Sequence, residues 1–166
     1  MSRNKLIFHL RIDIFPTQFS VRKESALEQR DAMLMQNARF YEAFEHGDMD
    51  ALADVWAHGQ HVKCIHPGWP ILVGWEDVKR SWQNILSSGV SMRFSLRDVK
   101  ADVYGTLGVV VLMEEITYVD GATTQTGEVM ATNLFEFDGR AWKMIHHHGS
   151  PMIPNEEEDF SAYKYN

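Results

Sequence analysis

The sequence predicts one α+β domain in which helices lie on one face of a curved antiparallel sheet. Two observations support this fold class. Apolar residues recur at helical spacing in the first half of the chain, whereas strand-like apolar segments fill the second half. Two tight turns, Asp120-Gly121 and Asp138-Gly139, divide the second half into long hairpin strands. The length of 166 residues suits a single domain with its own core.

The first predicted helix is the longest and covers residues 25–46. Ser25 and Glu28 have the spacing of a capping box, in which each side chain bonds the backbone amide of the other residue. Apolar residues follow at near-helical spacing, and Gly47 supplies a helix stop.

Two shorter helices and a pair of short strands are predicted next. Asp48 can cap a helix that ends at Trp56. Residues 61–66 and 71–73 are predicted to be a strand and its short return. A third helix opens at Gly74 and ends near residue 88. Its buried side is predicted from the spacing of Trp75, Val78, Trp82 and Ile85.

Long strands account for the remaining chain. Met92, Phe94 and Leu96 alternate with polar residues, as in a half-buried strand. Residues 107–119 and 123–137 form the next two strands, and the last one runs from residue 139 to residue 150. Lys143 is costly to bury, so its face of the last strand, with Ile145 and His147, is expected outside. The interior face is then expected to carry Trp142, Met144, His146, His148 and Ser150.

Composition and charge restrict the partners. The net charge is -7, and no basic stripe with interleaved aromatic residues occurs, so nucleic acid is not expected as a partner. No apolar run approaches the length of a membrane span. Cys64 is the only cysteine, which leaves no intrachain disulfide and favours a cytoplasmic location. We expect an N-terminal extension at 1–24, the domain at 25–154 and an acidic tail at 155–166.

Four segments match a known family in order and spacing. They are residues 43–52, 66–78, 118–121 and 138–150. Together they resemble the nuclear transport factor 2-like superfamily, in particular its SnoaL-like members and the association domain of calcium/calmodulin-dependent kinases. The resemblance spans about residues 28–153. It implies a cone in which the curved sheet wraps around the long first helix and encloses one pocket, and it implies a homodimer.

Ketosteroid isomerase-like members of this superfamily imply a candidate site. Their general base, a carboxylate before a turn, falls on His66, which precedes Pro67; a neutral imidazole can also accept a proton. The tyrosine of their first helix falls on Phe40, with Tyr41 beside it. Their strand acid falls on Asn133, which can donate a hydrogen bond but has no acidic proton.

The candidate catalytic residues are therefore His66 as base or acid, His148 to orient the substrate, and Asn133 as donor to an oxyanion. Glu114 and Glu115 are neighbours in an apolar strand, so one of them should face inward. The candidate substrate-binding residues are Tyr41, Trp56, Trp69, Trp82, Glu114, Trp142 and His146. Each histidine and tryptophan has a structural alternative, either a hydrogen-bonded histidine or a core side chain.

Three functions stay open at this point. The leading one is a small-molecule-binding protein, with cofactor-independent isomerase, dehydratase or cyclase chemistry if it is an enzyme. The second is a non-catalytic oligomerisation or ligand-sensing domain. The third is a metal-binding protein through His146 and His148, which would need a third ligand such as His66 or Glu114. The leading function requires no metal and no cofactor.

Overall fold

The computed structural model describes residues 25–152. Its helices are α1 (Ala26–His46), α2 (Met49–Val55) and α3 (Trp75–Leu86). Its strands are β1 (Lys63–Ile65), β2 (Leu72–Val73), β3 (Ser91–Tyr104), β4 (Leu107–Asp120), β5 (Thr123–Phe137) and β6 (Trp142–Pro151). None of the described helices is long and apolar enough to cross a membrane. The extension at 1–24 and the tail at 155–166 lie outside the described residues, so these domain boundaries stay predictions.

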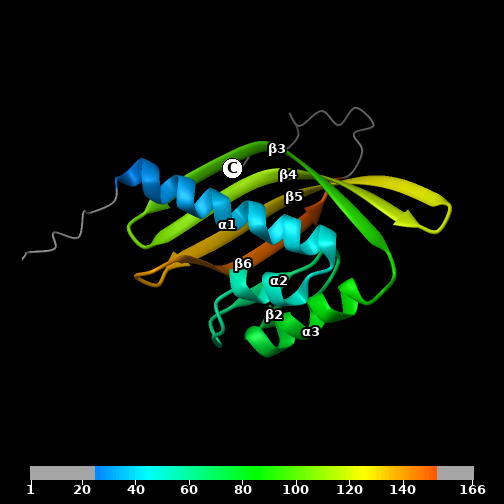
Figure 1. Ribbon diagram of the computed structural model, residues 1–166, viewed down its shortest axis with the longest axis horizontal. Coiled ribbons are helices and arrows are strands. Elements are labelled where there is room, and N and C mark those ends of the chain that lie inside the picture. Colours follow the sequence, from blue (N-terminus) through cyan, green and yellow to red (C-terminus); the bar gives the residue numbers. More distant parts are fainter. Residues whose placement is uncertain (1–24, 153–166) are drawn as a thin grey trace, which may run out of the picture.

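The strands form one sheet in the order β2-β1-β6-β5-β4-β3. Neighbouring strands are antiparallel except β1 and β6, which run parallel. A register shift between Arg97 and Lys100, with Asp98 at a φ of 54°, interrupts β3; such bulges bend a strand. Helix α1 lies across one face of the curved sheet, and the β4–β5 hairpin extends past the end of that helix (Figure 1). This arrangement confirms the predicted α+β cone.

Helix α1 begins and ends at the predicted signals. Ser25 Oγ accepts a hydrogen bond from the Glu28 amide at 3.2 Å, and the Ser25 amide donates to Glu28 Oε2 at 2.7 Å. This reciprocal pair is the predicted capping box. At the other end, Gly47 takes the left-handed conformation that closes the helix.

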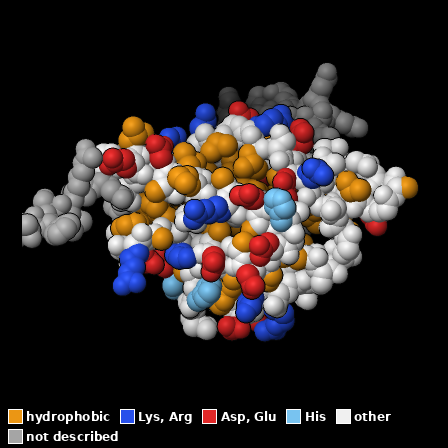
Figure 2. Space-filling model, viewed as in Figure 1, with side chains coloured by type: hydrophobic (Ala, Val, Ile, Leu, Met, Phe, Trp, Pro, Cys, Tyr) orange, Lys and Arg blue, Asp and Glu red, His pale blue; other side chains and the backbone are white. Residues whose placement is uncertain are grey.

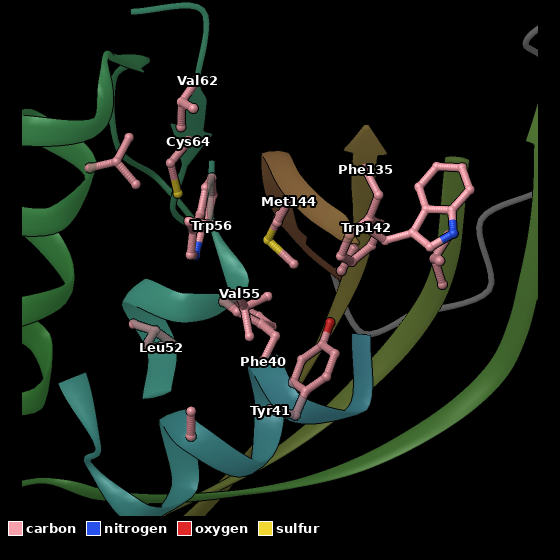
Figure 3. Packing of buried hydrophobic residues seen from close by; sticks show 14 of the residues in the cluster. Phe40, Tyr41, Leu52, Val55, Trp56, Val62, Cys64, Phe135, Trp142 and Met144 are labelled. Carbon is pink, nitrogen blue, oxygen red and sulfur yellow. The ribbon is translucent and has the colours of Figure 1, made fainter. Parts of the chain in front are cut away.

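Packing between α1 and the sheet is tight at one end and open at the other. Gly108 lets the two layers approach closely, because a Cβ atom there would lie 2.0 Å from Met33 Sδ. Farther along α1, Phe40 and Tyr41 rise toward the sheet among large buried side chains (Figure 3). The cavity described below opens beside these two rings. The close contact at Gly108 therefore lies nearer the start of α1, and the cavity lies nearer its end.

The predicted facing of β6 is wrong beyond Met144. In the register with β5, Phe135 lies opposite Met144 but Leu134 lies opposite His146, so Ile145 is an extra residue in β6. Such a β-bulge reverses the alternation of every later side chain. As a result His147 is buried, whereas His148 is exposed on the outer face of the sheet.

Candidate functional site

A cavity of about 220 Å³ lies between α1, α3, the loop after β1 and the inner faces of β3 and β4. Most of its wall is aromatic. The aromatic residues that line it are Phe40, Tyr41, Phe44, Trp69, Trp82, Phe94 and Tyr118. Three ionisable side chains also line it, namely His66, Glu114 and His147. Trp69 is 45% exposed and therefore lies at the rim of the cavity.

His66 is held as a neutral imidazole by its position beside α3. Its Nε2 lies 2.9 Å from Ser81 Oγ, and the Ser81 hydroxyl donates its only proton to the Val78 carbonyl at 2.7 Å. Since a carbonyl cannot donate, His66 Nε2 must carry the proton in its bond to Ser81. His66 Nδ1 therefore keeps its lone pair. Burial lowers the pKa of His66 to about 4, so the ring is uncharged at neutral pH.

Cys64 lies next to His66 without forming a reactive pair. Its sulfur is 3.9 Å from His66 Nδ1 and 3.8 Å from Nε2. An atom at nearly equal distance from both ring nitrogens cannot lie on the lone-pair axis of either. Burial also raises the pKa of the Cys64 thiol, which works against a nucleophilic thiolate.

A chain of hydrogen bonds joins the other two ionisable residues. The Tyr41 hydroxyl donates to Glu114 Oε1 at 2.6 Å, and Asn133 Nδ2 donates to that hydroxyl at 3.1 Å and to Asn37 Oδ1 at 2.8 Å. Asn133 Oδ1 lies 2.7 Å from His147 Nδ1 and accepts its proton. Burial raises the pKa of Glu114 to about 7 and lowers the pKa of His147 to about 3.

Five of the ten predicted site residues line the cavity. They are Tyr41, His66, Trp69, Trp82 and Glu114. Of the acidic neighbours, Glu114 faces inward and is 3% exposed, whereas Glu115 lies 3.4 Å from Arg97 on the other side of β4.

The other five predicted site residues lie elsewhere. Asn133 is fully buried behind the cavity, where both of its amide hydrogens are used, so it has none left for an oxyanion. Trp56 and Trp142 belong to the core away from the cavity. His146 and His148 lie beyond the bulge on the outer face, with ring centroids 6.2 Å apart.

His147 is the main residue that the sequence pattern missed. It was predicted to lie outside, but the bulge at Ile145 turns it into the cavity wall. No local residue marks that bulge. By contrast, Met92 and Phe94 also line the cavity, and their alternation in β3 had indicated an inward face.

A second groove differs from the cavity because charged side chains border it. This groove is wider, about 810 Å³, and lies between α1, α2 and the start of β6. Charges of both signs border it, including Arg39, Glu42, Asp54 and Lys143. Figure 2 shows such charges interspersed over this side of the molecule. Among the described residues, no three His, Cys, Asp or Glu side chains are grouped as metal ligands.

Comparison with known proteins adds three relationships. A family model described as a SnoaL-like domain matches residues 34–154. A crystal structure from Streptomyces avermitilis, an NTF2-like protein for which dehydratase activity has been proposed, is 33% identical with a TM-score of 0.70; the match covers 75% of this chain and 96% of that one. A proposed calcium/calmodulin-dependent protein kinase type II association domain from Thiobacillus denitrificans is 27% identical with a TM-score of 0.63, over 71% and 93% of the two chains.

One curated relative is also similar. The F-box protein SKIP8 from Arabidopsis thaliana is 28% identical over 127 residues, which is 76% of this chain and 52% of SKIP8. The match therefore spans about half the length of that relative.

Proposed function

Because the chain belongs to the SnoaL-like domain family, we propose that it binds a small molecule in the cavity and catalyses cofactor-independent proton transfer on it. Isomerisation, dehydration and cyclisation of carbonyl compounds all need such a step. The observation that supports this proposal is the meeting of two groups at one cavity. His66 offers a lone pair to accept a proton, and Glu114 has a carboxyl that carries a proton up to about pH 7.

The two groups divide the reaction between them. Glu114, protonated and positioned by Tyr41, donates a hydrogen bond to the carbonyl oxygen of the substrate. His66 Nδ1 removes a proton from the carbon next to that carbonyl, and the electron pair of the broken C–H bond moves into the carbonyl to form an enolate, whose oxygen is stabilised by the hydrogen bond from Glu114. The imidazolium then returns the proton to a different carbon. His66 and Glu114 thus act as base and acid on the same ligand.

A single-ring ketone tests this function. We expect the protein to convert 4-(hydroxymethyl)cyclohex-3-enone, a ketone that also carries a hydrogen-bond donor, to its conjugated isomer, followed by ultraviolet absorbance and by deuterium uptake in heavy water. His66→Gln should lower kcat by about 100-fold or more, because it removes the proton acceptor. His58→Gln serves as the control, since His58 is exposed and stacks on Trp75 away from the cavity. Equal rates for wild type and His66→Gln would remove His66 from the mechanism.

The pH profile gives an independent check on the two roles. His66 must be uncharged and Glu114 must be protonated, so the rate should be highest between about pH 4 and about pH 7. It should fall as Glu114 ionises above pH 7. A rate that keeps rising above pH 8 would contradict the role of Glu114 as acid.

A second candidate function is a non-catalytic oligomerisation or ligand-sensing domain. It is favoured by the outer face of the sheet, where half-buried apolar side chains follow each other across β4 and β5. These are Val109, Val111, Met113, Met130 and Leu134. We propose that this face joins two copies into a homodimer, because apolar patches of this kind mark interaction surfaces.

Light scattering coupled to gel filtration tests the dimer. Val111→Asp places a charge in the middle of the outer face and should convert a dimer to a monomer. Thr124→Asp introduces the same charge at the exposed tip of the β4–β5 hairpin and should leave the mass unchanged. A monomeric wild type would exclude the dimer at that concentration. The absence of a nucleic-acid partner and the cytoplasmic location stay predictions.

A further inference from the structure

We propose that the cavity selects an uncharged, single-ring ligand that donates a hydrogen bond to the imidazoles of His66 and His147. The inference concerns the same cavity and rests on the proposed function in one respect. It takes Glu114 to be protonated when the ligand binds. The hydrogen-bonding groups of the cavity wall define a chemical class of ligand, which the proposed function alone does not.

His66 presents one lone pair that no protein donor uses. Its Nε2–H is committed to Ser81, whose own proton is committed to the Val78 carbonyl. The remaining nitrogen, Nδ1, can therefore only accept, and Cys64 does not lie along its lone pair.

His147 also presents one lone pair, although its hydrogen-bond partners differ from those of His66. Its Nδ1–H is committed to Asn133 Oδ1. Asn133 cannot be turned around, because its amide group already donates to Asn37 and to Tyr41. His147 Nε2 is therefore also an acceptor, and among the described residues it has no hydrogen-bond partner. Two imidazoles on one cavity thus present lone pairs.

The cavity wall disfavours a charged ligand. Among the described residues that line the cavity, none is Lys or Arg. A carboxylate or phosphate on the ligand would be buried without a counter-charge and would face two lone pairs. A cationic ligand would have to pair with Glu114, which burial keeps protonated up to about pH 7. An uncharged ligand avoids both costs.

The volume of the cavity restricts the size of the ligand. A cavity of about 150 Å³ holds a benzene molecule. The volume of about 220 Å³ therefore admits one ring with a few substituent atoms and is too small for a system of four fused rings. The aromatic wall suits the faces and edges of such a ring. A ligand without a donor would displace water from the imidazoles and leave both acceptors unpaired.

Two isomeric probes test the donor requirement. Benzyl alcohol and anisole have the same atoms and one ring, but only the alcohol can donate a hydrogen bond. In NMR titrations of the full chain at pH 6, benzyl alcohol should bind about tenfold more tightly than anisole. Benzoate and benzylamine, which carry opposite charges, should bind more weakly than benzyl alcohol. Equal affinity of the two isomers, or tighter binding of either charged probe, would overturn the proposal.

A variant and a direct measurement complete the test. His66→Phe removes one acceptor while the Ser81 hydroxyl can still donate to Val78, so the preference for benzyl alcohol should shrink several-fold. Nitrogen-15 NMR of the unmodified protein should find the proton on Nε2 of His66 and on Nδ1 of His147. The opposite tautomers would overturn the proposal even if the variant does not fold. Binding selectivity without turnover of 4-(hydroxymethyl)cyclohex-3-enone would refute the proposed catalysis and leave this inference standing.

Discussion

At the scale of the residue, the neighbours Glu114 and Glu115 show how strand alternation gives identical side chains opposite environments. Glu114 and Glu115 are adjacent, but one is buried beside Tyr41 and the other lies near Arg97 on the outer face. The sequence predicted that one of the two faces inward, since both occur in an apolar strand. Both residues are glutamates, so the strand register, and not the residue type, decides which one faces inward. Their opposite environments make them a matched pair for experiment.

Glu114→Gln should stabilise the protein at high pH. The pKa of Glu114 rises from 4.5 in the unfolded chain to about 7 in the folded one, so ionisation costs stability as pH rises through this window. A shift of this size corresponds to at most about 3 kcal/mol at pH 8. Glutamine avoids the cost and can still accept the Tyr41 hydroxyl. Urea unfolding should show the gain at pH 8 and little gain at pH 4.5.

Glu115→Gln is the control for that experiment. Glu115 is half-buried, and its contact with Arg97 is one of two that Arg97 makes, the other being to Glu128. Exposed pairs of this kind contribute about 1 kcal/mol or less. Glu115→Gln should therefore change stability little at either pH. A similar gain from both variants would show that net charge, and not the burial of Glu114, is the cause.

At the scale of the element, local signals were sufficient for the helices and turns but not for the facing of β6. The capping box at Ser25 and the stop at Gly47 involve residues within one helical turn, and both were predicted. The bulge at Ile145 instead depends on how β6 pairs with β5. A pattern read along one strand cannot detect a shift between two strands, so His147 and His148 were assigned to the wrong faces.

The contact between α1 and β4 gives a prediction at the same scale. Gly108→Ala should lower the free energy of unfolding by about 1–3 kcal/mol, because the new methyl group would overlap Met33 and crowd Trp142. Gly127→Ala in β5 is the matched control, since a Cβ there would meet only Tyr118 Cε2 at an ordinary 3.5 Å. Urea unfolding of the two variants measures the difference. Equal stabilities would mean that α1 can shift away from the sheet at little cost.

At the scale of the whole molecule, the order of the segments along the sequence was enough to predict the cone. The chemistry of the cavity depends instead on contacts between residues that are far apart in the sequence. Tyr41 and Glu114 are separated by 73 residues, and Asn37 and Asn133 by 96. No spacing along the chain indicates such partners. His66 lines the cavity, where the strand end and the Pro-Gly turn after it position the ring. Asn133 lies behind the cavity and is hydrogen-bonded to Asn37, Tyr41 and His147.

The two buried histidines should make the whole fold sensitive to acid. Their pKa values, about 4 for His66 and about 3 for His147, lie below the unfolded value of 6.5. The stability that they contribute is therefore complete above pH 6.5 and is lost as pH falls toward 4. Protonation of Glu114 offsets part of this loss, which leaves a net decrease of about 2 kcal/mol between pH 7 and pH 4.5. Urea unfolding at these two pH values should show the decrease in wild type and a much smaller one in His66→Gln, which has lost one of the two titrating rings. An equal decrease in both proteins would mean that other groups, and not the histidines of the cavity, control stability in acid.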